Sequence, residues 1–338
     1  MTEPSEPGAG RPVDVDDLAD GVLANRRSAV SRAITVVESS RADHRAAARE
    51  LLSLLTPHSG AARRVGISGV PGVGKSTFIE TLGRLLTDLG HQVGVLAVDP
   101  SSARTGGSVL GDRTRMPTLT ADPRAYVRPS PTSGNLGGVT RATAQAVTIL
   151  EAAGHDVVLV ETVGVGQSET AVAGMVDTFL LLGLARTGDQ LQGIKKGVLE
   201  IADVVAINKS DGDRVTEAGA AARELTGALH LVYGRGTDWL PPVLSCSGMT
   251  GDGVWSVWEF CLRHVEHLGA EGLARKRSAQ QLELAWSLVR DELSQRLTQS
   301  ASVRAVRDEV RAAVLSGHLG AAQAADEILR AFDDEGRS

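Results

Sequence analysis

The chain has 338 residues, of which 42% are hydrophobic and 22% charged, and its formal net charge is -6. These values exclude a chain that is disordered throughout, and two cysteines are too few for a disulfide scaffold. The weak negative charge argues against a nucleic-acid partner. No apolar run reaches the roughly 18 residues of a membrane span, and the N-terminal segment has the pattern of neither a secretory signal nor a transit peptide. We expect a cytoplasmic protein with no membrane and no nucleic-acid partner.

The first part of the chain divides into a polar tail and a helical segment. Residues 1–13 are rich in Pro, Gly and Glu, which predicts a disordered tail. Apolar residues then repeat at helical spacing from Val15 to Leu55, and Pro57 and Gly60 end the pattern. We therefore predict an N-terminal helical extension over residues 14–60.

Short β-branched runs alternate with helical stretches over residues 61–268. Strands that alternate with helices are typical of crossover units. The apolar runs are continuous, as expected of strands that are buried on both faces. The pattern predicts an α/β fold with a mainly parallel sheet and helices on both faces.

Residues 269–335 carry helical spacing only. Three segments have apolar residues at this spacing, and the first of them contains Leu282, Trp286, Val289, Leu293 and Leu297. Apolar helix faces need a surface to cover them. Packing on the parent domain and packing in a dimer interface fit this pattern equally well.

A phosphate-binding motif follows the first strand run. The segment GVPGVGKS fits GxxxxGK[ST], between the strand RRVGIS and the helix STFIETLGRLL. Its glycines allow backbone N–H groups to converge on phosphate oxygens. Lys75 would reach the β- and γ-phosphates and Ser76 would ligate Mg²⁺. The predicted nucleotide-binding residues here are Gly69, Val70, Pro71, Gly72, Val73, Gly74, Lys75, Ser76 and Thr77.

A second motif points to guanine. The run Asn208-Lys209-Ser210-Asp211 follows the strand ADVVAI. The Asp211 carboxylate can accept hydrogen bonds from N1–H and from the exocyclic amine of guanine. Alone, this four-residue pattern is more often a polar turn, but downstream of a phosphate loop it predicts a guanine nucleotide, GTP or GDP. A backbone N–H of the loop Cys246, Ser247 and Gly248 could bind guanine O6, although an ordinary Ser/Gly loop would read the same way.

Two strands end in carboxylates, at Asp99 and Glu161. Ligands of open α/β sheets lie beyond the carboxyl ends of the strands. Both acids are therefore candidate Mg²⁺ ligands, directly or through water. Glu161 and Gly164 also match an acid-x-x-Gly switch element, in which the glycine N–H senses the γ-phosphate. The long polar loop after Asp99 contains Asp112 and is a candidate switch.

Several segments together resemble one known family. They are GVPGVGKST, VDPSS, TGGSVLGDRTRM, ETVGVGQSE, GDQLQGIKKG and NKSDG. In these segments the chain is similar to the methylmalonyl-CoA mutase-associated GTPases (MeaB/ArgK-like), in the G3E class of P-loop GTPases. The resemblance runs from about residue 15 to about residue 330. It implies a G3E-type GTPase domain over residues 61–268 and a C-terminal helical dimerisation arm over residues 269–335.

The resemblance also implies roles for individual residues. Catalytic roles fall on Lys75, Asp99, Asp112 and Glu161, and Mg²⁺ contacts on Ser76, Asp99, Asp112 and Glu161. Asp189, Gln192 and Lys195 match a third switch loop through which the family communicates with the mutase. The implied function is a GTP-hydrolysing homodimeric chaperone that gates adenosylcobalamin loading or protection of methylmalonyl-CoA mutase.

The chain departs from related patterns at three places. The residues Leu184-Ala-Arg-Thr187 replace a Pro-Gly-rich turn before the third switch. Gly248 stands where the family has Ala, and we expect little effect because the backbone makes the contact. Val165 stands where Ras-like GTPases carry a water-orienting Gln, which predicts slow intrinsic hydrolysis.

Three other functions fit the sequence less well. A P-loop phosphotransferase would need an acceptor pocket and a base, and the sequence identifies neither. A metallochaperone GTPase for another metalloenzyme would favour a His-rich or Cys-x-x-Cys tract. A non-hydrolysing scaffold is disfavoured by the intact Lys75 and Ser76. Cys261, His264 and His267 are too few for a structural zinc site, and we expect a partly exposed helix face there.

Overall fold

The computed structural model describes residues 13–39, 41–98, 116–129, 136–162, 168–185, 196–234 and 237–335. The chain divides into two compact units, of which the first ends at Gln280 and the second begins at Gln281.

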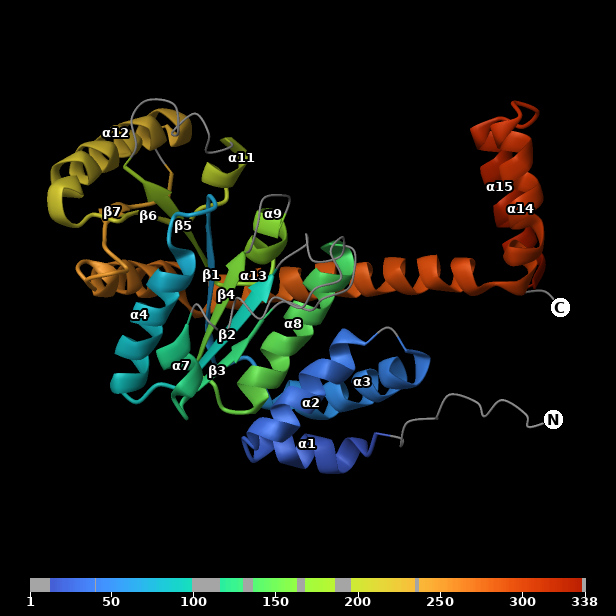
Figure 1. The fold of residues 1–338 in the computed structure, drawn as a ribbon, viewed down its shortest axis with the longest axis horizontal. Coiled ribbons are helices and arrows are strands. Elements are labelled where there is room, and N and C mark those ends of the chain that lie inside the picture. The colour runs from blue at the N-terminus through green and yellow to red at the C-terminus, as the bar shows by residue number, and fades with distance from the viewer. Residues whose placement is uncertain are drawn as a thin grey trace, which may run out of the picture. The chain divides into compact units, whose positions relative to one another are not determined.

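A seven-stranded sheet forms the centre of the first unit, in the order β3-β2-β4-β1-β5-β6-β7 (Figure 1). All six pairings of neighbouring strands are parallel, so the predicted α/β fold is confirmed. The strands are β1 (Arg63–Gly69), β2 (Val93–Val98), β3 (Ala125–Arg128), β4 (Val157–Thr162), β5 (Thr178–Leu184), β6 (Val204–Asn208) and β7 (Val243–Ser245).

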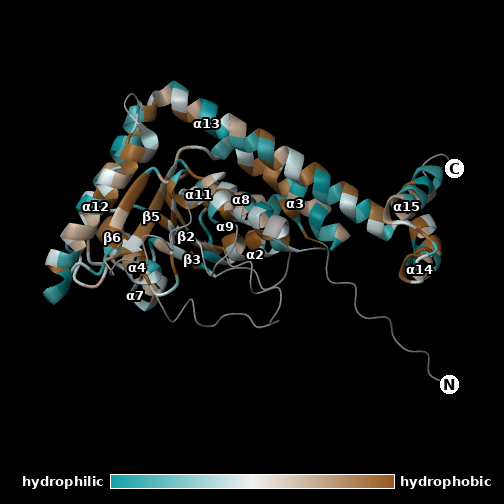
Figure 2. Cartoon of the chain, turned by 90° about the horizontal axis from the view of Figure 1, so that it is seen from above, coloured by the Kyte–Doolittle hydropathy of each residue, from teal (hydrophilic) through white to brown (hydrophobic). Residues whose placement is uncertain are grey.

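The central strands are buried on both faces. Every residue of β2, β4 and β6 is buried, and Figure 2 colours β6 as mostly hydrophobic. Continuous apolar runs in the sequence predict this environment, because both faces of each strand must be covered by helices.

Helices cover the two faces of the sheet. Helix α4 (Lys75–Asp88), helix α7 (Pro117–Ala121) and the start of α13 (Val254–Gln299) share one hydrophobic cluster with the strands, which contains Phe78, Leu119 and Trp258. Helices α8 (Leu136–Ala152), α9 (Ser168–Ala173) and α12 (Val215–Tyr233) share the other cluster. The short helix α11 (Lys196–Leu199) and the 3₁₀ turn η2 (Gly212–Arg214) lie between β5 and α12 in the sequence.

Three N-terminal helices pack against α8 and add to its hydrophobic cluster. They are α1 (Val15–Leu23), α2 (Arg27–Glu38) and α3 (Ala42–Leu55), and the 3₁₀ turn η1 (Thr56–His58) follows them. Ile34 and Leu51 are fully buried. The Arg27 guanidinium donates to the backbone oxygen of Ala125 at 3.0 Å, on the edge strand β3. A side chain of the extension thereby occupies an acceptor of the sheet edge.

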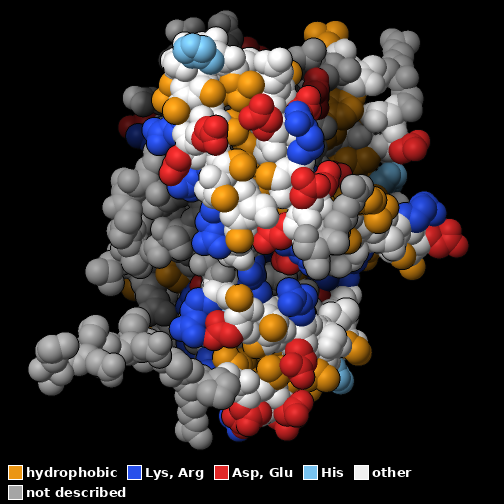
Figure 3. All heavy atoms as spheres, turned by 90° about the vertical axis from the view of Figure 1, so that its right-hand side faces the viewer, with side chains coloured by type: hydrophobic (Ala, Val, Ile, Leu, Met, Phe, Trp, Pro, Cys, Tyr) orange, Lys and Arg blue, Asp and Glu red, His pale blue; other side chains and the backbone are white. Residues whose placement is uncertain are grey.

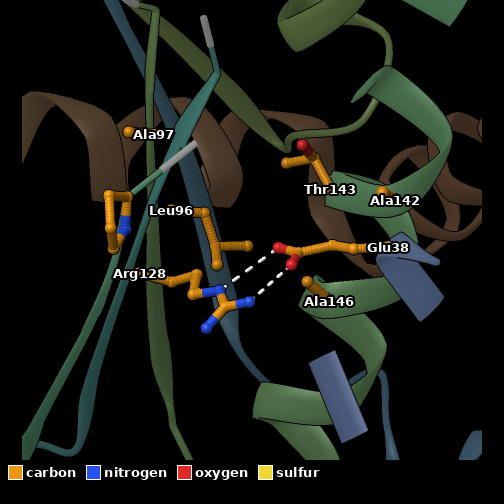
Figure 4. A pocket seen from close by; sticks show the side chains of 8 residues that line it. Glu38, Leu96, Ala97, Arg128, Ala142, Thr143 and Ala146 are labelled. Carbon is orange, nitrogen blue, oxygen red and sulfur yellow. Dashed lines mark hydrogen bonds and ion pairs between the residues drawn. The ribbon is translucent and has the colours of Figure 1, made fainter. Parts of the chain in front are cut away.

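An ion pair joins the end of α2 to the carboxyl end of β3. Arg128 Nε donates to Glu38 Oε1 at 3.2 Å, and Arg128 Nη2 donates to Glu38 Oε2. Figure 4 shows the pair beside Leu96 of β2 and Thr143 of α8, where these residues line a small pocket. Because the two side chains are only 22% and 13% exposed, solvent screens this pair less than a surface pair.

Aspartates cap the starts of neighbouring strands. Asp177 directly precedes β5, and its Oδ2 accepts the backbone N–H of Arg64 in β1 at 2.9 Å. Asp203 directly precedes β6, and its Oδ2 accepts the backbone N–H of Phe179 in β5 at 2.8 Å. Each carboxylate thus satisfies a backbone donor at the amino-terminal edge of the sheet.

Helix α13 is fastened to the same edge. Arg277 donates to both carboxylate oxygens of Asp177, at 2.8 and 2.7 Å. Lys276 Nζ donates to the backbone oxygen of Asp177 at 2.6 Å, and Gln280 Nε2 donates to that of Val176 at 2.8 Å. These contacts attach residues 276–280, which the sequence pattern places in the C-terminal arm, to the first unit.

The second unit contains the end of α13 together with α14 (Ala301–Leu315) and α15 (Ala321–Glu335), which pack on each other. Ser300 caps α14, because its Oγ accepts the backbone N–H of Val303 at 3.1 Å. Large apolar side chains on the end of α13 are exposed; they are Leu282, Trp286, Val289 and Leu293.

No helix among the described residues is long and apolar enough to cross a membrane. On the face drawn in Figure 3, acidic and basic side chains are interspersed among apolar ones.

Candidate nucleotide-binding site

The phosphate loop lies between β1 and α4, and its glycines are required for two reasons. Gly72 and Gly74 have φ angles of 80° and 95°, a left-handed conformation that favours glycine. A Cβ on Gly69 would lie 2.4 Å from the backbone oxygen of Leu182, and one on Gly74 would lie 2.9 Å from Asn208 Nδ2. The loop therefore follows its tight path only with glycine at these positions.

Two residues of the predicted catalytic set, Lys75 and Glu161, lie within the described residues, as does the predicted Mg²⁺ contact Ser76. Lys75 begins α4, and its Nζ donates to the backbone oxygen of Gly69 at 2.8 Å. Ser76 Oγ donates to Glu161 Oε1 at 2.9 Å, and Glu161 is only 2% exposed at the carboxyl end of β4. A hydroxyl and a carboxylate are oxygen ligands of the kind that Mg²⁺ prefers, so this pair fits that ion.

The Asn-Lys-x-Asp motif contacts the phosphate loop directly. Asn208 Nδ2 donates to the backbone oxygen of Val73 at 2.9 Å, and Lys209 Nζ donates to that of Gly72 at 2.7 Å. Lys209 has a φ angle of 62°, which is uncommon outside glycine. Backbone strain of this kind persists where the surrounding structure enforces it, as it does at binding sites.

The loop after β7 lies against the same motif. Ser247 Oγ donates to Asp211 Oδ1 at 3.3 Å, and the backbone N–H of Gly248 donates to Asn208 Oδ1 at 2.9 Å. Burial raises the pKa of the Cys246 thiol to about 12, so the thiol stays protonated. Its Sγ lies 3.8 Å from Asn208 Oδ1. The structure thus brings the Cys246–Gly248 loop together with Asn208 and Asp211.

Other predicted residues lie outside the described part of the chain. They are Asp99, Asp112, Gly164, Val165, Asp189, Gln192 and Lys195.

Thr81 contacts the loop of residues 246–248, a contact that was not predicted from the sequence. Its Oγ1 donates to the backbone oxygen of Gly248 at 2.6 Å. A threonine inside a helix carries no sequence signal for such a contact, because the partner is 167 residues away.

The expectation of a partly exposed face at Cys261, His264 and His267 is wrong for the first two residues. Cys261 and His264 are buried. His264 Nδ1 lies 2.9 Å from Thr178 Oγ1, and its Nε2 lies 3.3 Å from Asp203 Oδ1. Burial lowers the pKa of His264 and raises that of the Cys261 thiol. Within the described ranges, no three His, Cys, Asp or Glu side chains are grouped to hold a metal ion.

A parallel sheet that carries a phosphate loop and an Asn-Lys-x-Asp motif at one edge is the arrangement of a P-loop GTPase, a hydrolase acting on GTP. Comparison with known proteins narrows this class. Residues 30–302 match the family model described as methylmalonyl-CoA mutase-associated GTPase MeaB. The chain therefore belongs to the MeaB/ArgK-like family of G3E-class GTPases, as its motifs indicated.

Individual relatives agree with this family. A Mycobacterium tuberculosis protein named "Probable GTPase" is 58% identical over 316 residues, which cover 93% of this chain and 94% of the relative. The mouse protein named "Methylmalonic aciduria type A homolog, mitochondrial" is 44% identical over 94% of this chain and 79% of its own length. A crystal structure described as a LAO/AO transport system kinase is 32% identical, with a TM-score of 0.71, and covers 98% of this chain and 100% of its own.

Proposed function

We propose that GTP hydrolysis by this chain gates the loading or protection of adenosylcobalamin in methylmalonyl-CoA mutase. The observation that carries the proposal is the contact of the guanine motif with the phosphate loop, through Asn208 and Val73 at 2.9 Å. Base recognition and phosphate binding are thereby one unit, as a nucleotide switch requires. The description of the matching family model names this mutase, which supports the choice of partner.

The chain's own side chains have distinct roles in this proposal. The Lys75 ammonium neutralises charge on the β- and γ-phosphates. Ser76 and Glu161 would hold Mg²⁺ together with Asp99 and Asp112, and the ion would supply further charge neutralisation. The Asp211 carboxylate accepts hydrogen bonds from guanine N1–H and N2–H, next to the loop of residues 246–248.

We assign the response of GTP hydrolysis to the mutase to the third switch loop. Asp189, Gln192 and Lys195 precede α11 in the sequence, and their proposed role is communication with the mutase. Val165 lacks the amide that would orient water, so intrinsic turnover is slow. Ordering of the switch loops by the partner accelerates hydrolysis, because positioning of water and charge is most of what a protein contributes to phosphoryl transfer.

Single-turnover GTP hydrolysis with and without the mutase tests this scheme. We expect Lys195→Ala to leave intrinsic hydrolysis nearly unchanged and to lose most of the stimulation by the mutase. Lys75→Ala should lose both rates, because its charge acts on the phosphates themselves. A Lys195→Ala variant that responds like wild type contradicts the third-switch assignment, and a wild type that no cobalamin-dependent mutase stimulates contradicts the partner.

A phosphotransferase is the second candidate, because the 32% identical crystal structure is described as a kinase. The two functions differ in the fate of the γ-phosphate. A GTPase releases it as inorganic phosphate, and a kinase transfers it to an acceptor. Incubation with γ-labelled GTP and a metabolite extract distinguishes them, since label that appears in an organic product instead of in phosphate favours the kinase.

A further inference from the structure

Helix α4 and the loop after β7 are in direct backbone contact at Gly248. A Cβ built on Gly248 would lie 2.9 Å from both the N and the Cα atom of Phe78. Real Cβ atoms do not approach other atoms this closely, and backbone atoms inside a buried helix cannot move aside easily. Gly248 does not have a left-handed φ angle. An added Cβ at this position would therefore force the loop or the backbone of α4 to shift, whereas the sequence predicts little effect of Gly in place of Ala.

Thr81 fixes the same contact from the next turn of α4. Its Oγ1 donates to the backbone oxygen of Gly248 at 2.6 Å. Threonine hydroxyls inside helices commonly bond the carbonyl four residues earlier in their own helix. Here the hydroxyl instead reaches a loop that is distant in the sequence, and the β-branched side chain has few alternative rotamers. The loop is therefore held at a defined distance from the helix.

Together with α4 itself, these contacts connect the phosphate loop to the 246–248 loop by two routes. The backbone N–H of Gly248 donates to Asn208 Oδ1 at 2.9 Å. Asn208 Nδ2 donates to the backbone oxygen of Val73 at 2.9 Å, and Val73 precedes Lys75, where α4 begins. One route therefore runs from the phosphate loop through α4 and Thr81 to Gly248, and the other runs through Asn208.

We infer that Thr81 is a positioning residue for guanine-nucleotide binding, and that it acts through the backbone of Gly248. The inference rests on the proposed contacts of Asp211 and the 246–248 loop with the base. Without the Thr81 hydroxyl, the loop loses a tether to the element that holds the phosphates. The nucleotide then dissociates faster, and the site discriminates less between guanine and adenine.

The test uses the full-length protein with Mg²⁺ and fluorescent mant-GDP, whose dissociation rate is measured by stopped flow. Thr81→Val removes the hydroxyl with little change of shape, and we expect dissociation about 2- to 10-fold faster, the range for loss of one hydrogen bond. Thr81→Ser retains the donor and should dissociate near the wild-type rate. The ratio of the Kd values for ADP and GDP should fall for Thr81→Val only.

A matched control is Thr226→Val in α12, where the hydroxyl donates to Ala222 of its own helix at 2.8 Å. This variant should dissociate mant-GDP at the wild-type rate. A second pair compares Gly248→Ala, expected to accelerate release, with Gly227→Ala, an exposed position where an added Cβ meets nothing within 4 Å. If Gly248→Ala does not fold, the release rates of the Thr81 variants still test the inference.

The outcomes separate this inference from the proposed base contacts. If Asp211→Asn leaves the affinity for GDP unchanged, the proposed base contacts are contradicted and the inference is overturned with them. If Asp211→Asn weakens GDP binding while Thr81→Val keeps the wild-type release rate and ADP-to-GDP ratio, only the inference is overturned. A lower melting temperature of Thr81→Val with unchanged release and ratio assigns Thr81 a purely structural role and also overturns it. Equal acceleration in Thr81→Val and Thr81→Ser overturns the role of the hydroxyl.

Discussion

At the residue scale, the proposed recognition of guanine depends on one carboxylate, that of Asp211. Asp211 lies three residues after Asn208, next to Ser247. In the proposed base contacts its carboxylate accepts hydrogen bonds from two guanine donors, a pair that adenine lacks. We predict that GTP binds far better than ATP. Asp211→Asn should weaken GTP binding by about 1.5–3 kcal/mol, the range for a hydrogen bond to a charged group.

Isothermal titration calorimetry measures both affinities. Asp213→Asn is the matched control, because this exposed aspartate lies two residues further on in η2 and should bind GTP like wild type. Equal affinity of the wild-type chain for ATP and GTP would falsify this prediction.

At the element scale, α13 is held to the sheet by a buried ion pair. Asp177 is 1% exposed, and its two oxygens accept from Arg277 at 2.8 and 2.7 Å. Arg277→Met would leave a buried carboxylate without its guanidinium. We expect a loss of about 3 kcal/mol or more in the free energy of unfolding, measured by urea denaturation.

The control for this variant is Arg275→Met, since the Arg275 side chain is 76% exposed and lies 3.7 Å from Glu271. Arg275→Met should lower the free energy of unfolding by less than about 0.5 kcal/mol. Equal losses for the two variants would mean that the Asp177 pair does not stabilise the attachment of α13.

A histidine at the same junction predicts acid sensitivity. Burial lowers the pKa of His264, so the unfolded chain takes up this proton at a higher pH than the folded chain. The contribution of His264 to the free energy of unfolding is greatest above about pH 6.5. It decreases as the pH falls toward the pKa of the folded state. The contribution is at most about 1.4 kcal/mol per pH unit.

Urea denaturation between pH 7 and pH 5 measures this slope. His264→Gln should show a smaller decrease in stability than wild type, and His58→Gln, a change at an exposed position, should show the wild-type decrease. Identical slopes for wild type and His264→Gln would rule out His264 as the source.

At the scale of the whole molecule, the second unit has an exposed apolar stripe on the end of α13. Leu282, Trp286, Val289 and Leu293 recur at helical spacing and are 63%, 56%, 45% and 53% exposed. We propose that a second copy covers this stripe and predict a homodimer. Trp286→Glu combined with Leu293→Glu should give a monomer that still binds GDP, because two charges would be buried in the interface.

Light scattering at micromolar concentration measures the mass. Ser294→Glu, a charge on an exposed position of the same helix, should remain dimeric, whereas a monomeric wild type would contradict the prediction. A truncated form for this experiment should end after Gln280. Truncation after Leu268 would remove Arg277 and leave Asp177 unpaired.

The parts of this protein that are local in the chain could be predicted from the sequence. The phosphate loop and Asn208–Asp211 are short runs whose backbone geometry depends on a few consecutive residues. The strands are continuous apolar runs that periodicity identifies. The family and the parallel sheet followed from these features, because both depend on elements and their order.

Only the tertiary structure decided the contacts between distant segments. Thr81 and Gly248 are 167 residues apart, and Arg277 and Asp177 are 100 residues apart. The sequence predicts little effect of Gly248, because the close approach of the Phe78 backbone is visible only in the fold. The sequence predicts a partly exposed His264, because its burial depends on how α13 packs on the sheet. Helical spacing shows which residues share a face, but the fold determines what that face meets.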